Sequence, residues 1–253
     1  MGIFDGRAII VTGAASGIGR AIAEYLAERG ATIGVFDLNG AGAEKTVAAI
    51  AGKGGSASAF QVDICDYAAV EKAIDSFAGV NGPLYGLVNN AGWDEARNFI
   101  DTEPAFWRKV ININLNGPLN MTHVALKHMV EAGEGRVVSI ASDAGRVGSS
   151  GEAVYSAAKG GTIALMKTLA RECARKGITF NSVCPGPTDT PLLASFNESS
   201  GGKLAPALER SVPMKRLAQP ADFPQVVGMF LDPASSYITG QTISVSGGLS
   251  MHG

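Results

Sequence analysis

The chain has 253 residues, a length that one α/β domain can reach, and 46% of them are hydrophobic against 17% that are charged. A formal net charge of -2 provides no basic surface, which argues against nucleic acid or an anionic membrane as a partner. Three cysteines without paired spacing argue against a disulfide framework, so we expect a cytoplasmic protein. No secretory leader or membrane-length apolar run is recognised. The histidines have no zinc-site spacing, so we expect no metal.

Short β-branched runs alternate with longer alanine-rich amphipathic segments along the chain. Apolar strands separated by helices predict right-handed crossovers and a parallel sheet buried on both faces. We therefore expect an α/β fold: a single domain over residues 1–253, with a doubly wound sheet of about seven strands and helices on both faces. Ligands bind such sheets at the carboxyl ends of the strands. The predicted strands are residues 8–11, 33–36, 57–62, 84–88, 136–140, 179–183 and 242–245.

A glycine-rich segment follows the first predicted strand, and residues 20–29 after it are predicted to be helical. Glycines in this position let the backbone approach a pyrophosphate, whose charge is stabilised by free amides and by the positive end of the helix dipole. Such a segment can also be only a turn, but the strand before it and the helix after it favour a ligand. The expected cofactor contacts are Gly13, Ser16, Gly17, Ile18 and Gly19.

The acidic residue at the end of the second predicted strand bears on which dinucleotide binds. Asp37 can accept hydrogen bonds from an adenosine ribose and repel a 2′-phosphate. Neither Ser16 nor Leu38 offers a cation for that phosphate, although Arg20 lies nearby. We expect NAD as the cofactor, with NADP less favoured. The alternative role for Asp37 is to cap the turn at Asn39.

The ends of the third and fourth predicted strands carry further candidate contacts. Asp63 is placed to meet the adenine amine, or alternatively to cap the helix that follows Asp66. The paired asparagines after the fourth strand can contact a dinucleotide or cross-link strand ends. The expected cofactor contacts here are Asp63, Ile64, Asn90, Ala91 and Gly92.

A long helical segment opens at Pro104 and contains Asn114 shortly before Gly117 and Pro118. Asparagine, glycine and proline in mid-helix are locally unfavourable, which predicts a kink or a carbonyl freed for water. A merely tolerated break is the alternative.

Tyr155 and Lys159 stand four residues apart in residues 152–176, which favour helix, so both side chains project from one face. An adjacent cation draws the pKa of a tyrosine down from ~10 towards neutrality, as general acid/base chemistry requires. Tyrosine and lysine one turn apart also occur on many solvated helices. The pair therefore gains meaning only from the motifs around it.

Six motifs, TGAASGIG, NNAG, NLNG, SIAS, YSAAK and CPGPTDT, occur in an order that resembles the short-chain dehydrogenase/reductase family over essentially the full length. The resemblance implies a Rossmann-like fold and a nicotinamide-dependent oxidoreductase. It implies a catalytic set of Asn114, Ser142, Tyr155 and Lys159, the last two also contacting the cofactor. It further implies that Pro185, Gly186, Thr188 and Thr190 border the nicotinamide carboxamide.

By the same resemblance, Tyr155 accepts the proton of a substrate hydroxyl and Ser142 donates a hydrogen bond to the substrate oxygen. Lys159 lowers the pKa of Tyr155 and holds a ribose hydroxyl, and Asn114 holds a water that relays the proton.

The segments NNAGWD, SDAGRVGSSGEAVY, CPGPTDTPLL and SVSGGLSMHG look most like those of 2-hydroxycyclohexanecarboxyl-CoA dehydrogenases. 3-Oxoacyl-carrier-protein reductases are the next resemblance. The expected substrate is thus a small molecule with a secondary alcohol or ketone, with a cyclic hydroxyacyl-CoA ester as a candidate. A non-catalytic NAD-binding sensor is the alternative class, disfavoured by the intact catalytic set. A homotetramer built on the glycine-rich tail, residues 240–253, follows from the resemblance alone.

Residues 190–217 combine apolar side chains with glycine, serine and proline residues that favour loops, and this combination predicts a substrate lid. Its basic residues, Lys203, Arg210, Lys215 and Arg216, can meet the phosphates of CoA, although an ordinary solvated surface is favoured. Trp93 can alternatively be a packing residue. The residues expected to line the substrate pocket are Trp93, Asp94, Arg146, Leu192 and Leu193.

Overall fold

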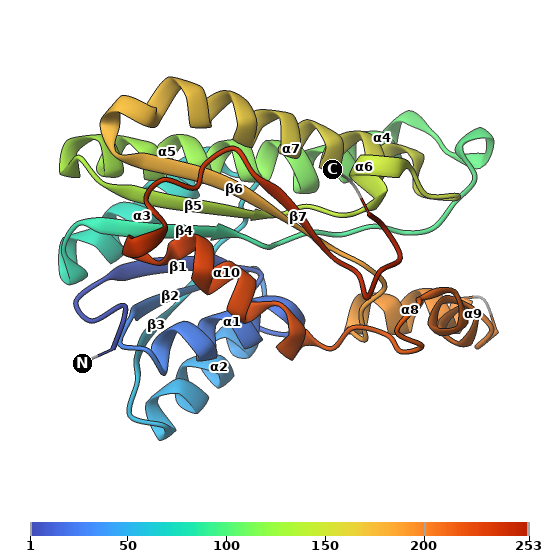
Figure 1. Cartoon of the computed structure of the whole chain (residues 1–253), viewed down its shortest axis with the longest axis horizontal. Helices are drawn as coiled ribbons and strands as arrows, with labels where there is room; N and C mark the ends of the chain where they lie inside the picture. The colour runs from blue at the N-terminus through green and yellow to red at the C-terminus, as the bar shows by residue number, and fades with distance from the viewer. Residues whose placement is uncertain (1, 200, 252–253) are drawn as a thin grey trace.

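The computed structural model describes residues 2–199 and 201–251. Seven strands form one parallel sheet in the order β3-β2-β1-β4-β5-β6-β7 (Figure 1). The predicted doubly wound α/β architecture is confirmed. Each predicted strand begins and ends within two residues of the corresponding observed strand. The strands are β1 (Ala8–Thr12), β2 (Thr32–Asp37), β3 (Ser56–Gln61), β4 (Leu84–Asn89), β5 (Gly135–Ile140), β6 (Ile178–Pro185) and β7 (Thr242–Val245).

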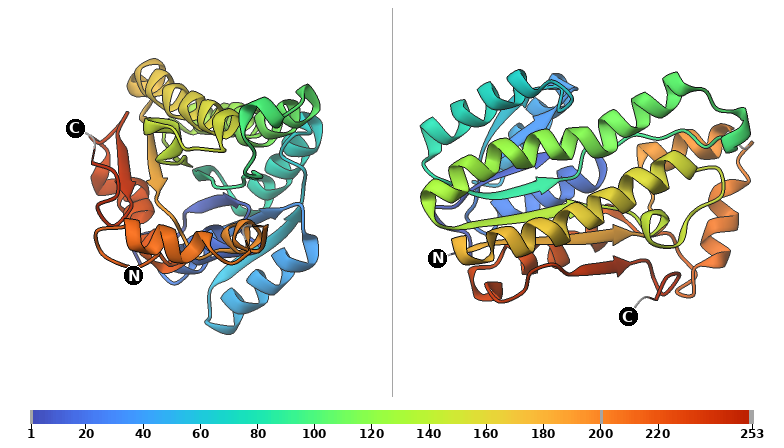
Figure 2. Two further views of the ribbon diagram at one scale, coloured as in Figure 1. Left: turned by 90° about the vertical axis from the view of Figure 1, so that its right-hand side faces the viewer. Right: turned by 90° about the horizontal axis from the view of Figure 1, so that it is seen from above.

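The central strands are buried along their whole length, whereas the edge strands β3 and β7 are partly exposed. Helices cover both faces of the sheet, as Figure 2 shows from two directions. One core joins β1 and β2 to Leu26 of α1 and Phe230 of α10; the other joins the opposite face to Phe77 of α3 and Met166 of α7. The α-helices are α1 (Gly17–Ala27), α2 (Gly40–Gly52), α3 (Tyr67–Asn81), α4 (Pro104–Ile111), α5 (Gly117–Ala132), α6 (Ala144–Val147), α7 (Ala153–Cys173), α8 (Pro191–Ser199), α9 (Leu204–Ser211) and α10 (Pro224–Leu231).

Two helical predictions gain detail from the structure. The break expected near Asn114 is a π-helical segment, Asn112–Asn116, between α4 and α5. The long helix predicted over residues 152–176 is α7 followed by a 3₁₀ turn, Ala174–Lys176. Other 3₁₀ turns are Phe99–Asp101, Pro220–Asp222 and Pro233–Ser235. In the described part of the chain, no helix combines the length and the apolarity needed to cross a bilayer.

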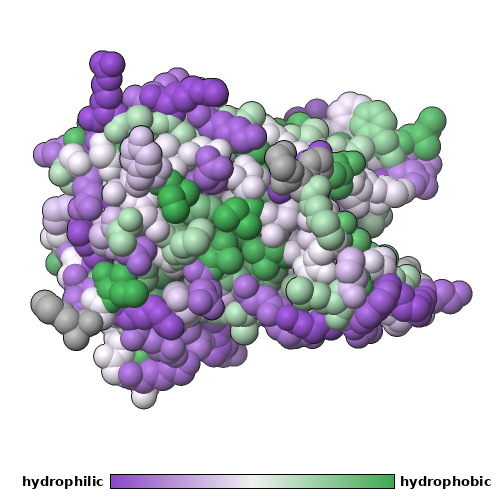
Figure 3. Space-filling model, in the orientation of Figure 1, coloured by the Kyte–Doolittle hydropathy of each residue, from purple (hydrophilic) through white to green (hydrophobic). Residues whose placement is uncertain are grey.

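The strand order reverses between β1 and β4, and the carboxyl ends of these strands are where ligands bind in such sheets. The segment predicted as a lid folds into α8 and α9, which project beyond that end of the sheet on the right of Figure 1. Ser200, part of the predicted flexible run, lies outside the described residues. The space-filling view shows a notch above these two helices, at the right of the molecule (Figure 3).

Candidate active site and cofactor pocket

A cavity of about 1300 Å³ opens at the carboxyl ends of the strands. It extends from the glycine-rich turn and the end of β2 to α7 and the two projecting helices α8 and α9. One continuous space therefore adjoins most of the residues that the sequence singled out. Those residues are Gly13, Ser16, Gly17, Ile18, Asp37, Leu38, Asp63, Ile64, Asn90, Ala91, Gly92, Trp93, Ser142, Tyr155, Lys159, Pro185, Gly186, Thr188, Thr190, Leu192 and Leu193.

The glycine-rich turn leaves the start of α1 open towards this cavity. Gly13 and Gly17 have φ values of 63° and 55°, in the left-handed region that favours glycine. The helix begins at Gly17, three residues before the predicted start, because Ser16 is extended and ends the turn early. The Ser16 side chain makes no capping hydrogen bond, so the first amides of α1 are not satisfied by it. An uncapped helix start facing a cavity suits an anionic group.

Gly19 serves this turn by close packing and does not line the cavity. A Cβ atom at this position would lie 2.3 Å from the Gly13 carbonyl oxygen and 2.4 Å from Nδ2 of Asn90. The helix can therefore approach the turn this closely only because residue 19 lacks a side chain.

The Asp37 carboxylate joins the end of β2 to the glycine-rich turn. Its Oδ2 atom accepts a hydrogen bond from the Ala15 amide at 2.9 Å, and Oδ1 accepts one from the Asn39 amide at 2.8 Å. The turn-capping role considered from sequence is thus present. Each carboxylate oxygen retains a further lone pair for a ligand, and Asp37 lines the cavity.

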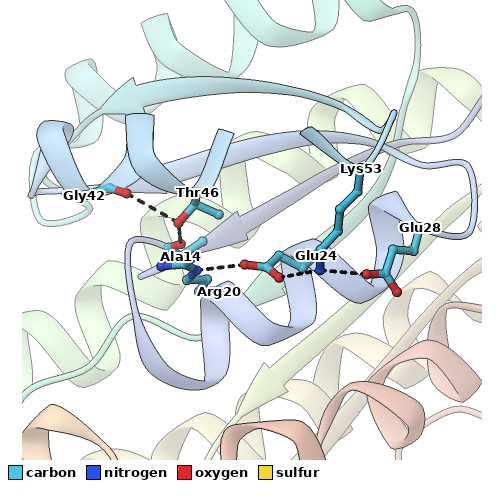
Figure 4. Close-up of polar contacts among 7 residues, drawn as sticks. All are labelled: Ala14, Arg20, Glu24, Glu28, Gly42, Thr46 and Lys53. Carbon is cyan, nitrogen blue, oxygen red and sulfur yellow. Dashed lines mark hydrogen bonds and ion pairs between the residues drawn. The ribbon is translucent and has the colours of Figure 1, made fainter. Parts of the chain in front are cut away.

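Arg20, the cation nearest to the turn, is engaged elsewhere (Figure 4). Its Nε donates to Glu24 at 2.8 Å, and Glu24 also pairs with Lys53 at 3.0 Å. These contacts hold the Arg20 side chain along α1. On the other side of the turn, the Thr46 hydroxyl donates to the Ala14 carbonyl at 2.9 Å and fixes α2 against it.

The end of β4 is tied to the end of β1, as the cross-linking alternative proposed. The main-chain amide of Asn90 donates to Oγ1 of Thr12 at 2.9 Å, and its side-chain Nδ2 donates to the Thr12 carbonyl oxygen at 2.9 Å. Asp63 accepts a hydrogen bond from the Cys65 amide at 2.9 Å, whereas Asp66 caps α3. The alternative helix-capping role therefore belongs to Asp66 and not to Asp63.

Asn114 lies fully buried behind the cavity and acts on its wall. Its side chain brackets the main chain of Trp93: Nδ2 donates to the Trp93 carbonyl at 2.6 Å, and Oδ1 accepts from the Trp93 amide at 3.3 Å. The main-chain carbonyl of Asn114 accepts the Thr162 hydroxyl at 3.1 Å. The carbonyl predicted to be free for water thus already has one protein donor, and the water relay stays a prediction.

Ser142, Tyr155 and Lys159 meet in the cavity, but their electrostatics differ from the prediction. Burial raises the pKa of Tyr155, the charges of Glu152 and Asp94 add to the rise, and a hydrogen bond with Ser142 opposes it. Burial also lowers the pKa of Lys159 to about 8. The predicted lowering of the Tyr155 pKa by Lys159 is therefore wrong for this structure.

The geometry of Lys159 gives the reason. Its Nζ lies 5.5 Å from the Tyr155 ring centroid and donates to the Ile140 carbonyl at 2.9 Å. The ammonium thus points first to the end of β5, and the loss of water around each side chain is the largest cause of its pKa shift.

Two residues expected in the substrate pocket lie outside the main cavity. Arg146 turns towards the edge strand β7, where its guanidinium donates to Ser244 at 2.7 Å, and Asp143 accepts from the same hydroxyl. Asp94 is buried and lines a small separate pocket with the start of α7. Their nearness in sequence to the motifs did not determine which way the side chains point.

Trp93 lines the cavity and also packs against neighbouring side chains. The predicted pocket role and the alternative packing role are therefore compatible. The ammonium of Lys109 lies 3.4 Å from its ring centroid, and Phe106 meets it edge-on at 6.1 Å between centroids. Lys109 was not predicted, because a single lysine on α4 carries no sequence signal. Further lining residues outside the segments singled out from sequence include Ala96, Asn112 and Ile113.

The lid segment presents apolar residues to the cavity, and its four basic residues are not among the described residues that line it. Arg216 pairs with Asp222 at 2.6 Å, and Nζ of Lys215 donates to the Arg210 carbonyl at 2.8 Å. The solvated-surface interpretation of these cations is therefore favoured.

The donor and acceptor set of the cavity suits a nicotinamide dinucleotide. Open amides at the start of α1 suit a pyrophosphate, Asp37 suits ribose hydroxyls, and Lys159 presents an ammonium at the opposite end. The size of the cavity leaves room for a second small molecule between Tyr155 and the helices α8 and α9.

Comparisons with known proteins agree with this arrangement. A family model described as Enoyl-(Acyl carrier protein) reductase matches residues 13–250. A 3-oxoacyl-acyl-carrier-protein reductase of Vibrio harveyi is 33% identical over 247 residues, which cover 98% of each protein. A cis-4-hydroxycyclohexanecarboxylate dehydrogenase of Sinomonas cyclohexanicum is 37% identical over 246 residues, 97% of each. The crystal structure of a variant actinorhodin polyketide ketoreductase with NADPH superimposes with a TM-score of 0.93 at 32% identity, covering 97% of this chain and 98% of that one.

Proposed function

Because the chain belongs to the short-chain dehydrogenase/reductase family, we propose that it is an NAD-dependent enzyme that interconverts a secondary alcohol and a ketone. The observation that supports this most directly is one continuous cavity. It adjoins an open helix start and Asp37 at one end and Ser142, Tyr155 and Lys159 at the other. A dinucleotide held along this space brings its nicotinamide ring next to Ser142, Tyr155 and Lys159, the side chains that can donate or accept a proton.

When bound, the oxidised nicotinamide supplies the acceptor for the hydride of the carbinol carbon. In alcohol oxidation, the phenolate of Tyr155 accepts the hydroxyl proton as the carbon–oxygen double bond forms. The Ser142 hydroxyl donates a hydrogen bond to the substrate oxygen and orients it. Lys159 contacts the ribose, and Asn114 fixes the wall at Trp93. Reduction of a ketone uses the same groups in reverse, with Tyr155 as the acid.

NAD is proposed over NADP because of the charges around Asp37. The carboxylate stands at the end of β2 and lines the cavity, where it disfavours a 2′-phosphate, and Arg20 is held by Glu24. Leu38, the next residue, is 68% exposed and offers no charge.

We predict that the double variant Asp37→Asn, Leu38→Arg reverses the cofactor preference. Removing one repulsive charge and adding one cation should change the ratio of kcat/KM for NAD and NADP by roughly 100-fold in favour of NADP. Steady-state kinetics with both cofactors measures the ratio. Arg20→Gln is the matched control and should leave the ratio unchanged; a shift as large as that of the double variant would show that Arg20 reads the phosphate.

A cyclic hydroxyacyl-CoA ester is the proposed substrate. The apolar side chains of α8 and α9 that line the cavity suit an alicyclic ring, and one relative acts on a hydroxycyclohexanecarboxylate. The second candidate substrate is a 3-oxoacyl-carrier-protein, the substrate after which the relative from Vibrio harveyi is named. A catalytically silent NAD sensor is disfavoured because Ser142, Tyr155 and Lys159 converge on one cavity.

The function is tested by following NADH absorbance with a panel of substrates. The panel contains simple secondary alcohols, cyclic hydroxy acids, their CoA esters and a 3-oxoacyl thioester for the reverse reaction. The highest kcat/KM is expected for a cyclic hydroxyacyl-CoA ester with NAD. Preference for the 3-oxoacyl thioester would favour the second candidate, and tight NAD binding without any turnover would support a sensor.

We also propose a homotetramer in the cytoplasm. The strand β7 is an open sheet edge in the single chain, and Figure 3 shows apolar residues exposed on the face over β7 and α10, where Met229 is 39% exposed. All three cysteines are free, as a reducing compartment requires. Light scattering coupled to gel filtration measures the mass, and a monomer would contradict the proposed assembly.

A further inference from the structure

Asp94 is a buried carboxyl group beside the proposed catalytic residues, with no role assigned so far. The residue is 4% exposed, and its Oδ2 atom is buried without a hydrogen-bond partner among the described residues. It lines a small pocket together with residues 151–154, the segment that leads into the first turn of α7. Tyr155 follows directly on that segment. A buried carboxyl with an unsatisfied oxygen is costly, so its presence here calls for a physical explanation.

The backbone around Asp94 is held from both sides. Asn114 brackets the preceding residue, Trp93, with hydrogen bonds of 2.6 and 3.3 Å. The amide of Arg97 donates to the Gly151 carbonyl at 2.8 Å and joins this loop to the segment before α7. These two attachments keep the carboxyl group facing the start of α7 and away from solvent.

The charges around Asp94 come from its own loop and from α7. Glu95 pairs with Arg97 at 2.6 Å, and both Arg97 and Glu152 line the small pocket together with Asp94. Lys159 acts on Asp94 from α7 through its charge. Burial raises the pKa of Asp94 to about 7, and a hydrogen bond from the Glu95 amide opposes the rise. The charges of Glu152 and Glu95 add to it, and the charge of Lys159 lowers it. The group therefore holds its proton to a higher pH than an ordinary aspartate does.

The charge of Asp94 reaches both members of the proposed proton-transfer pair. Ionised Asp94 raises the pKa of Tyr155, because a nearby negative charge disfavours the phenolate. It also raises the pKa of Lys159, because the same charge favours the ammonium. When Asp94 is protonated, both groups release their protons at lower pH.

We propose that Asp94 is a positioning residue that acts through Tyr155 and Lys159: its buried charge sets the pH range in which the pair exchanges protons with the substrate. The proposal rests on the proposed function in one respect, the role of Tyr155 as the base. In alcohol oxidation, an ionised Asp94 raises the pH at which Tyr155 becomes a phenolate. In ketone reduction, the same charge keeps Tyr155 protonated, and thus able to donate its proton, up to a higher pH.

The test compares wild-type protein with Asp94→Asn, which keeps the shape and removes the charge. The pH profile of kcat for alcohol oxidation should move downward by about 1 pH unit. Glu95→Gln is the matched control, since it removes a carboxylate from the same loop that acts on Asp94 but not directly on Tyr155 or Lys159, and its profile should move far less than that of Asp94→Asn. Asp94→Glu retains the charge and should restore most of the wild-type profile.

A second measurement separates this proposal from the proposed function. The ultraviolet difference absorbance of the phenolate, with Tyr155→Phe as the blank, follows the titration of Tyr155 without any substrate. Its midpoint should fall by the same amount in Asp94→Asn, even if no substrate of the panel is turned over. Coincident midpoints in wild type and Asp94→Asn would overturn the proposal, as would a lower kcat with an unshifted profile, which indicates a purely structural role. If Asp94→Asn does not fold, Asp94→Ser provides the neutral variant for both measurements.

Discussion

Replacing Tyr155 with phenylalanine is expected to lower kcat by roughly 10³-fold, while the Kd for NAD stays within about twofold of the wild-type value. The substitution removes one hydroxyl and leaves the ring in place, so packing at the start of α7 is preserved. Without the hydroxyl, no side chain at this position accepts the substrate proton. Stopped-flow or steady-state kinetics and calorimetric titration with NAD measure the two quantities.

The pH dependence of the wild-type enzyme follows from the same residue. Because burial raises the pKa of Tyr155, the protonated form prevails at neutral pH and the base form fills as the pH rises. Alcohol oxidation should therefore accelerate towards alkaline pH, and ketone reduction should decline there. The Tyr155→Phe variant should lose this dependence together with its turnover.

Tyr237→Phe is the matched control. Tyr237 is fully exposed, and it is distant in sequence from Tyr155 and Lys159, the residues of α7 that line the cavity. It should retain wild-type kinetics. Near-wild-type turnover of Tyr155→Phe would refute the assignment of Tyr155 as the acid/base group, whatever the substrate. Loss of both turnover and NAD binding would instead point to a structural effect on the cavity.

The sequence could predict the fold because its signals are local and periodic. The central strands are short apolar runs, and burial on both faces of a parallel sheet favours that composition. The break at Asn114 was also visible, since asparagine, glycine and proline each weaken a helix for reasons that do not depend on the surroundings. The meeting of Ser142, Tyr155 and Lys159 followed from motif order, and the structure places all three on one cavity.

The remaining parts of the site depend on the direction of side chains and on solvent exclusion. Arg146 was expected in the pocket, but its guanidinium donates to Ser244 of the edge strand β7. Lys109 reaches the cavity from a segment that carries no recognisable motif. The sign of the Tyr155 pKa shift was wrong for a related reason. Sequence spacing indicates that a cation is near, but only the packed structure shows how much water both groups have lost.

Gly19→Ala is expected to weaken NAD binding by at least ~100-fold, a loss comparable to deleting a main contact to the pyrophosphate. The new Cβ would lie 2.3 Å from the carbonyl oxygen of Gly13 and 2.4 Å from Nδ2 of Asn90. The first of these atoms belongs to the backbone, so the turn itself must shift. A displaced turn no longer presents the first amides of α1 to the cavity, and Asn90 loses its geometry towards Thr12.

Gly79→Ala in α3 separates this steric effect from the general effect of adding a methyl group to a helix. A Cβ at Gly79 meets nothing within 4 Å, and alanine favours helix over glycine by about 1 kcal/mol. Gly79→Ala should therefore raise the free energy of unfolding by about 0.5–1 kcal/mol with unchanged NAD affinity. Gly19→Ala should lower it by about 1–3 kcal/mol, because overpacking outweighs the same helical gain. Denaturant unfolding and calorimetric titration of both variants measure the contrast, and wild-type NAD affinity in Gly19→Ala would show that the close approach of α1 to the turn is dispensable for binding.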